Sequence, residues 1–274
     1  MIFVMVAVDF AFLDSGTGGI PYMISLREKL PEASFVYLGD TLHFPYGEKP
    51  QEEIESSAEG AIRKIIGMWN PRAIVIACNT ISVTALGALR GTFRDRPIIG
   101  TVPAIKLGAK VSKNRRIGLL ATNATARHPY CKKLCADFAG DCAVFTRGDP
   151  ELVSFIERRF FVATDEEKAA AVRPALDFFR ANGCDTVILG CTHFTHIADE
   201  FKKEAGSAMS IIDSREGVSN QAALKLMAAG GRPGAEAFPR GQNLSFFVTK
   251  ADAREEREYE TLCGRLGIPW GGVV

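Results

Sequence analysis

Short apolar runs alternate along the chain with longer segments that repeat apolar residues at helical spacing. Runs rich in β-branched and aromatic residues predict strands at 10–13, 35–38, 73–77, 117–120 and 186–189. The segments 51–68 and 166–180 are apolar on one face and charged on the other, which predicts covering helices. This alternation is typical of α/β proteins, in which helices flank mainly parallel sheets.

Two apolar stretches resemble membrane or export segments only at first sight. Residues 1–13 include Asp9 and lack a basic start, so we expect a buried strand rather than a signal peptide. Residues 73–89 are uncharged but contain several hydroxyl and amide side chains, so they predict a strand, a turn and a buried helix. A helix near 221–227 is followed by a predicted loop at 232–234, a strand at 244–249 and a charged final helix.

Length and charge narrow the function. A chain of 274 residues, 47% of them hydrophobic, exceeds the usual size of one domain and favours two. Lysine and arginine (33) nearly balance aspartate and glutamate (32), and neither sign dominates a long stretch. The chain therefore has no run of like charge that would indicate binding to nucleic acid or a membrane surface. We expect a small-molecule partner and a cytoplasmic protein.

Seven cysteines without an export signal are expected to stay reduced, and their odd number argues against a disulfide framework. Cys131 and Cys135, with His128 upstream, lack the second ligand pair of a zinc site, so no metal is expected. Five cysteines are expected to pack as small apolar residues without a chemical role: Cys131, Cys135, Cys142, Cys184 and Cys263.

A weak internal repeat marks the other two cysteines. Residues 73–80 and 186–193 each read as an apolar strand, a small residue, a cysteine and two polar residues. Ligands of open α/β sheets bind outside the carboxyl ends of strands, so Cys78 and Cys191 occupy positions that suit chemistry. Inverting an α-carbon requires an acid/base group on each face, and thiols can serve. Either cysteine alone is better explained as a core residue at a strand end; the matched pair favours function.

Polar residues near the two cysteines could assist them. His193 follows Cys191 by two residues, and Asp14 ends a neighbouring strand, so each could hold or withdraw a thiol proton. The glycine-rich turn at 14–19 could present backbone N–H groups to a carboxylate. No dinucleotide fingerprint or phosphate loop is present, which disfavours a nucleotide cofactor. The segment Pro45-Tyr46-Gly47 could lie over a ligand, although its composition alone favours a surface turn.

Four motifs in order resemble the glutamate racemases of the aspartate/glutamate racemase superfamily, between about residue 10 and residue 220. They are Asp14-Ser15-Gly16 with Gly18-Gly19, Gly39-Asp40 with Pro45-Tyr46-Gly47, Ala77-Cys78-Asn79-Thr80, and Gly190-Cys191-Thr192-His193. The resemblance implies two doubly wound α/β domains with mainly parallel sheets and an active site in the cleft between them. The first domain would comprise residues 1–102 and 214–274, and the second 103–213.

The same resemblance implies that Cys78 and Cys191 are the acid/base residues, assisted by Asp14 and His193. It assigns substrate binding to Asp14, Ser15, Tyr46, Gly47, Asn79, Thr80, Thr192 and His193, and it places Thr122, Thr125 and Glu157 at the cleft. Family members need no pyridoxal phosphate, flavin or metal, in agreement with the absence of a cofactor motif here. They supply D-glutamate for peptidoglycan and are commonly homodimers.

The chain departs from the family beside the matched residues. Thr195-His196 stands where proline and leucine are common, and Thr17 and Ala126 each replace a common valine. These changes bear on substrate fit and rate more than on reaction type. The rival interpretations are an aspartate racemase, a maleate isomerase or a decarboxylase of the same superfamily, and a catalytically silent ligand-binding homologue.

Overall fold

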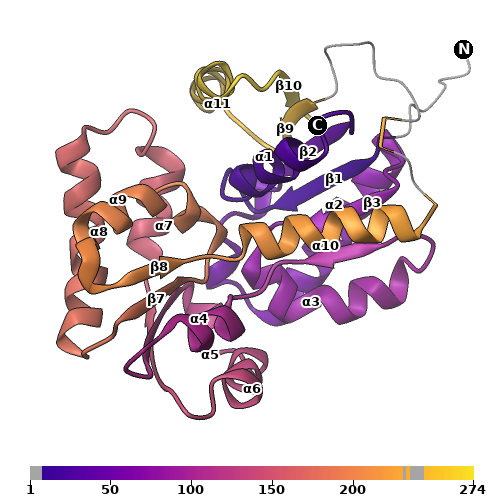
Figure 1. Ribbon diagram of the computed structural model, residues 1–274. Coiled ribbons are helices and arrows are strands. Elements are labelled where there is room, and N and C mark those ends of the chain that lie inside the picture. The colour runs from indigo at the N-terminus through magenta and orange to yellow at the C-terminus, as the bar shows by residue number, and fades with distance from the viewer. Residues whose placement is uncertain (1–7, 231–232, 235–243) are drawn as a thin grey trace, which may run out of the picture. The chain divides into compact units, whose positions relative to one another are not determined.

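The computed structural model describes residues 8–230, 233–234 and 244–274, and Figure 1 shows its helices and strands. The chain divides into two compact units, one made of residues 1–101 and 215–274 and the other of residues 102–214. Each unit is a parallel sheet flanked by helices. The start of the predicted strand before Val8 and the predicted loop residue Arg232 lie outside the described residues.

The first unit contains a six-stranded sheet in the order β10-β9-β2-β1-β3-β4, with every strand pair parallel. Its strands are β1 (Phe10–Asp14), β2 (Phe35–Gly39), β3 (Ala73–Ile76), β4 (Ile98–Gly100), β9 (Leu244–Val248) and β10 (Trp270–Val273). The chain leaves β1 for β2 on one side and later returns to β3 on the other. This reversal of strand order is the switch point at which doubly wound sheets bind ligands.

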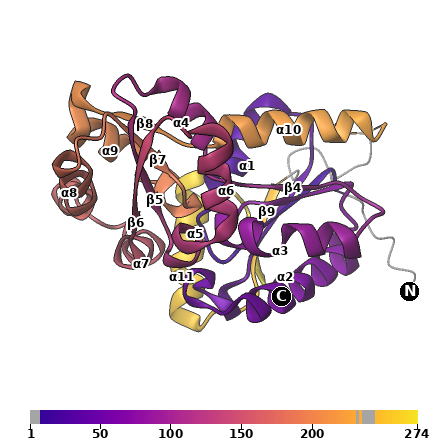
Figure 2. The same ribbon diagram turned by 90° about the horizontal axis from the view of Figure 1, so that it is seen from below.

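Helices cover both faces of this sheet. They are α1 (Ile20–Lys29), α2 (Gln51–Trp69), α3 (Asn79–Thr92), α10 (Arg215–Ala228) and α11 (Ala253–Leu266). Helices α1 and α10 pack together on one face and α2 and α3 on the other (Figure 2). Apolar residues of α2 and α3, such as Ile62 and Ile81, join β1 and β3 in one buried cluster. Burial of this apolar stripe stabilises the strands that carry the candidate residues.

The second unit is a four-stranded parallel sheet in the order β6-β5-β7-β8. Its strands are β5 (Arg116–Ala121), β6 (Ala143–Gly148), β7 (Thr186–Leu189) and β8 (Ser210–Ile212). Its helices are α4 (Ile105–Val111), α5 (Asn123–Arg127), α6 (Pro129–Phe138), α7 (Pro150–Arg158), α8 (Asp165–Ala181) and α9 (Ala198–Ala205). Helices α4 and α6 pack on each other, as do α8 and α9. A buried cluster joins α4 and α6 to β5 and β7.

Short 3₁₀-helices lie in the connections between the longer elements, and two of them, η1 and η3, come soon after strands. They are η1 (Thr41–His43), η2 (Tyr46–Glu48), η3 (Thr192–Thr195) and η4 (Gly206–Ala208). In parallel sheets all carboxyl ends lie at one edge, so the residues that follow the strands gather there. In the first unit this edge carries Asp14, Asp40 and Cys78. In the second unit it carries Thr122 and Cys191.

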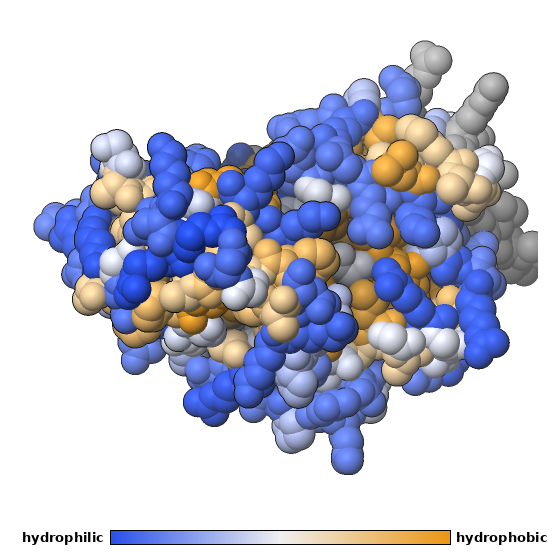
Figure 3. Space-filling view, turned by 60° about the horizontal axis from the view of Figure 1, so that its bottom comes forward, coloured by the Kyte–Doolittle hydropathy of each residue, from blue (hydrophilic) through white to orange (hydrophobic). Residues whose placement is uncertain are grey.

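The surface bears few large apolar side chains. Leu224 and Met227 of α10 are 67% and 55% exposed. Figure 3 shows hydrophilic residues over much of one face, with hydrophobic residues in smaller patches among them. Among the described residues, no helix combines the length and the apolar character needed to cross a membrane.

The predicted α/β class with parallel sheets is confirmed. All five strands predicted before residue 200 are present, as are the helices predicted at 51–68 and 166–180 and the strand at 244–249. Strands β4, β6 and β10 were not predicted.

Candidate active site

Cys78 lies where β3 ends and α3 begins. It is the N-cap residue of α3, with extended backbone angles, and its side chain is 5% exposed. Because the first N–H groups of a helix lack partners within it, this position favours negative charge on a nearby sulfur or ligand. The predicted helix start after Cys78 is confirmed. Cys191 differs, since only the four-residue η3 follows it.

The glycine-rich turn at 15–19 packs against the end of β3. A Cβ on Gly19 would come within 2.5 Å of the Ala77 Cβ, so only glycine permits this approach. The Tyr37 hydroxyl donates to the Gly16 carbonyl at 2.8 Å and accepts the Gly19 N–H at 2.9 Å. The fully buried Asp14 accepts the Ser15 N–H at 2.7 Å. These contacts hold Asp14 at the strand end next to that of Cys78.

Asn79 has a buried side-chain amide without a hydrogen-bond partner among the described residues. The residue is 2% exposed, and neither its Oδ1 nor its Nδ2 is paired. Leaving a buried polar group unpaired costs about 1–3 kcal/mol, so such groups call for an explanation. A ligand beside Cys78 would supply the missing partners. This observation supports the binding role that the sequence predicts for Asn79.

Tyr46 is 1% exposed, so the surface turn that its composition favours is wrong. Its hydroxyl donates to Asp40 Oδ2 at 2.5 Å, and Ser57 is a second hydrogen-bond partner. Burial, the Asp40 carboxylate and the charge on Cys78 raise the pKa of Tyr46 far above its usual value, so the phenol stays protonated. The hydroxyl proton is committed to Asp40, which leaves only an oxygen lone pair for a ligand.

Asp40 is the centre of this network. Its carboxylate is 2% exposed and accepts hydrogen bonds from His43 Nδ1 at 2.8 Å and Thr249 Oγ1 at 2.8 Å, in addition to Tyr46. A buried carboxylate is stable as an anion only when several donors surround it. The network therefore fixes the Tyr46 ring from three elements of the first unit.

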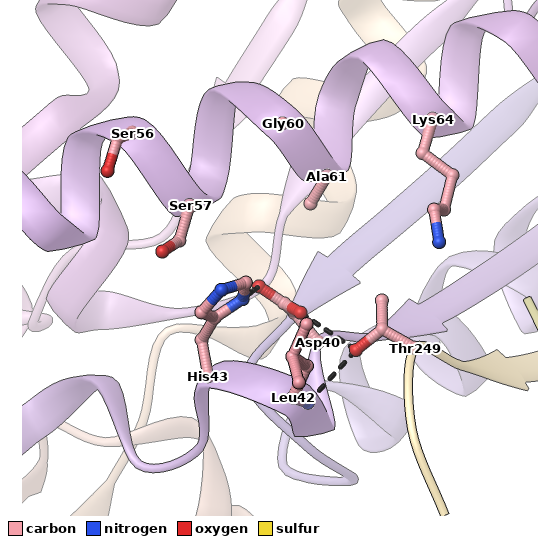
Figure 4. A pocket seen from close by; sticks show the side chains of 9 residues that line it. All are labelled: Asp40, Leu42, His43, Ser56, Ser57, Gly60, Ala61, Lys64 and Thr249. Carbon is pink, nitrogen blue, oxygen red and sulfur yellow. Dashed lines mark hydrogen bonds and ion pairs between the residues drawn. The ribbon is translucent and has the colours of Figure 1, made fainter.

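Asp40 also lines a cavity of about 270 Å³. Figure 4 shows Asp40 bonded to His43 and Thr249 at one wall, with Ser57, Ala61 and Lys64 of α2 at the other. The Lys64 ammonium donates to the Val274 carbonyl oxygen at 2.7 Å. Cys78 does not line this cavity, so the cavity adjoins the supporting network rather than the thiol.

Cys191 is 4% exposed and has a histidine neighbour in η3. Its Sγ lies 3.9 Å from Nδ1 of His193, and Nε2 of His193 lies 2.9 Å from Glu157 Oε2. The side chains of His193 and Glu157 are 3% and 6% exposed. Glu157 comes from α7, 36 positions away in sequence. Thiol, imidazole and carboxylate thus form one buried chain.

The charge of His193 follows from these two partners. Burial alone lowers its pKa, but the hydrogen bonds to Cys191 and Glu157 and their charges outweigh burial and raise the pKa well above the usual value. Glu157 therefore orients the imidazole and stabilises its cationic form. A cationic imidazole beside Cys191 can stabilise a thiolate or keep a proton near the sulfur.

Three threonines lie at the same strand ends of the second unit. Thr122 caps α5 and accepts the Thr125 N–H at 3.2 Å, and the Thr122 hydroxyl also donates to Thr125 Oγ1 at 3.1 Å. Both side chains are buried. Thr192 follows Cys191 directly and is 1% exposed. The structure places Thr122 directly after β5 and Thr192 one residue after the Cys191 that follows β7 and Gly190, at one edge of one sheet.

The other cysteines lie in different settings. Burial raises the pKa of Cys131 to about 12, that of Cys184 to about 11 and that of Cys263 to about 12, so these thiols stay protonated. Within the described part of the chain, no three His, Cys, Asp or Glu side chains are placed to hold a metal ion.

Sequence reasoning assigned no role to Asp40, Ser57 or Thr249, which support Tyr46. Asp40 was detectable as a carboxylate directly after an apolar strand, and Ser57 as a polar residue on the apolar face of α2. Thr249 carried no comparable signal, because its contact with Asp40 spans 209 positions.

An α/β architecture with buried thiols at the carboxyl ends of parallel strands is typical of enzymes that act on small molecules. The chain belongs to the Asp/Glu/Hydantoin racemase family, whose model matches residues 24–221. A glutamate racemase of Treponema pallidum (strain Nichols) is 37% identical over 267 residues, covering 97% of this chain and 96% of the relative. A glutamate racemase of Proteus mirabilis is 41% identical over 213 residues, 77% of this chain and 73% of the relative.

Solved structures show the same fold. Escherichia coli glutamate racemase in complex with L-glutamate and the activator UDP-MurNAc-Ala superposes with a TM-score of 0.83 at 28% identity, covering 97% of this chain and 98% of that one. A glutamate racemase isoform of Bacillus anthracis gives a TM-score of 0.78 at 26% identity, with 97% of each chain covered.

Proposed function

We propose that this protein is a cofactor-independent glutamate racemase in which Cys78 and Cys191 act on opposite faces of one substrate. The observation that carries the proposal is the pair of buried thiols, each at the carboxyl end of a strand, with His193 beside Cys191. The similarity of the chain to glutamate racemases indicates that the substrate is glutamate. The two compact units serve as the two domains that contribute one thiol each.

The reaction removes a proton from one face of the α-carbon and adds a different proton to the opposite face. One cysteine, as a thiolate, takes the α-hydrogen as a proton, and the electron pair of the C–H bond delocalises onto the carboxylate. The other cysteine, as a thiol, donates its proton to the opposite face, which gives the other enantiomer. Thiol and thiolate have then exchanged places, so the protein is ready for the reverse reaction.

The polar residues around the thiols divide the remaining tasks. His193, held by Glu157, stabilises charge at Cys191, and Asp14 keeps a proton near Cys78. The unpaired Asn79 amide and the N–H groups of Tyr46 and Gly47 at the start of η2 bind the substrate's carboxylates, together with Ser15, Thr80 and Thr192. The protein works in the cytoplasm as a homodimer and supplies D-glutamate for peptidoglycan.

The direct test is to incubate purified protein with glutamate, without added cofactor, and to monitor racemisation of the glutamate by circular dichroism. We expect L- and D-glutamate to interconvert and aspartate to react far more slowly. Cys78→Ser and Cys191→Ser should each lose activity by at least about a hundredfold, because a serine hydroxyl is a far weaker acid. Cys184→Ser is the matched control and should retain activity, since Cys184 is a buried thiol outside the site. Full activity in both test variants would contradict the mechanism, and faster turnover of aspartate would contradict the substrate.

A further inference from the structure

The turn that carries His193 and the helix that carries Glu157 meet a second time beside their ion pair. His196 follows η3, and its N–H donates to the His193 carbonyl at 3.1 Å. Phe160 and Phe161 follow α7, which ends at Arg158, one residue after Glu157. The His196 ring meets the Phe161 ring edge-on, with centroids 5.2 Å apart and planes at 85°, and it lies 6.1 Å from the Phe160 ring.

Both phenylalanine rings are anchored on the α7 side. They contact each other edge-on at 5.1 Å, and the Phe160 N–H donates to the Phe155 carbonyl within the last turn of α7. The Lys168 ammonium of α8 lies 5.0 Å above the Phe160 ring. The rings therefore form a fixed surface against which His196 packs.

Glu157 needs such a support because of where it sits. It is the penultimate residue of α7, and the ends of helices fray. A small displacement of that end lengthens the 2.9 Å contact between Glu157 and His193, and an oriented acid/base group loses effect over about 1 Å. Edge-to-face ring pairs contribute beyond their area burial, so the His196 contact resists this displacement.

We propose that His196 is a positioning residue, which packs against Phe160 and Phe161 and thereby keeps Glu157 on His193 and His193 at Cys191. The inference rests on the proposed role of Cys191 as an acid/base residue. It assigns a role to a position where the family commonly has leucine, and it predicts that apolar bulk, rather than the imidazole nitrogens, is what the position requires.

The variants are His196→Ala, which removes the contact, and His196→Leu and His196→Phe, which keep apolar bulk. Phe145→Ala is the matched control, because it removes the contact of the Phe145 ring on β6 with Arg116 of β5 in the same unit, away from Cys191. The two enantiomers have equal free energy, so kcat/KM stays equal for both in every variant. The informative readouts are therefore kcat and the primary isotope effect with α-deuterated L- and D-glutamate.

His196→Ala should lower kcat about three- to tenfold. It should raise the isotope effect for only one enantiomer, the one from which Cys191 takes the hydrogen. His196→Leu and His196→Phe should have the kcat and the isotope effects of the unmodified protein. Phe145→Ala should lower stability and leave the isotope effects unchanged.

A second readout needs no turnover. Proton NMR of the imidazole N–H that His193 shares with Glu157, assigned with Glu157→Gln, should show this resonance shifted or lost in His196→Ala and restored in His196→Leu. An unchanged resonance and unchanged isotope effects in His196→Ala, or equal changes in Phe145→Ala, would overturn the proposal. If the unmodified protein does not racemise glutamate, the proposed function fails, and the NMR comparison still decides the role of His196.

Discussion

At the scale of single residues, Cys78 and Cys191 occupy equivalent strand ends but have different neighbours. Cys78 is the N-cap residue of an α-helix and lies near the fixed Tyr46–Asp40 pair, whereas Cys191 contacts a histidine that a glutamate holds. Strand-end position was readable from sequence because it depends on local pattern. The pairing of His193 with Glu157 depends on tertiary packing, and only the resemblance pointed to Glu157.

The variant Glu157→Gln tests the charge of His193. The pKa of His193 is raised in the folded protein, so protonated His193 stabilises the fold. This stabilisation is complete below about pH 6.5, the usual pKa of histidine, and is lost as the pH rises through the raised pKa of the folded protein. Removing the Glu157 charge lowers the pKa of His193, so the variant should lose this stabilisation at a lower pH than the unmodified protein. Racemisation should fall about tenfold, with its alkaline limb at lower pH. Urea unfolding and kcat measured between about pH 6 and 9 provide the check.

Glu151→Gln is the control, because Glu151 is an exposed glutamate on the same helix. Identical pH profiles for Glu157→Gln and the unmodified protein would show that the carboxylate does not set the charge of His193.

Thr101 offers a separate test of stability. Its hydroxyl is fully buried after β4 and has no partner among the described residues. Thr101→Val removes this unpaired group with little change of shape, so the free energy of unfolding should rise by about 1 kcal/mol. Thr195→Val is the contrast, because the Thr195 hydroxyl donates to the Thr192 carbonyl at 2.7 Å. This variant removes a hydrogen bond, so its free energy of unfolding should fall by about 1 kcal/mol. Urea midpoints compare the two; a loss in both would mean that Thr101 is paired in solution.

At the scale of elements, the strands that sequence missed are those with weak apolar patterns. Strand β6 is an edge strand without a fully buried residue, β10 contains two adjacent glycines, and β4 has three residues. Pairing with a neighbour forms these strands, and that cannot be read from their own residues. The long amphipathic helices α2 and α8 were predicted to within about two residues because burial of one face dictates their period.

Helix α8 begins with a capping box that should be measurable. Thr164 accepts the Glu167 N–H at 3.2 Å, and Glu167 accepts the Thr164 N–H at 2.8 Å. Thr164→Ala leaves the first turn without its cap and should lower the free energy of unfolding by about 1 kcal/mol. Thr164→Ser keeps the hydroxyl and should lose little. Equal losses in chemical denaturation would mean that the hydroxyl does not act as the cap.

At the scale of the whole molecule, one chain passes from the first unit to the second and back. The crossings lie near residues 101 and 215, so residues 215–274 complete the first unit with α10, β9, α11 and β10. The matching strand-cysteine pattern in each unit fits a reaction that needs one thiol on each face of the substrate. Local patterns located both thiols, but opposition across a substrate depends on how the units meet, which no local pattern encodes.

The central claim, two thiols acting from opposite faces, is tested most directly by the fate of the α-hydrogen. L-Glutamate is incubated with the purified protein in deuterium oxide, and both enantiomers are analysed by mass spectrometry during the first turnovers. Two opposed bases predict that the D-glutamate formed carries one deuterium at the α-carbon while the remaining L-glutamate carries almost none. Product that retains the original hydrogen, or L-glutamate that gains deuterium as fast as product forms, would show that a single base serves both faces.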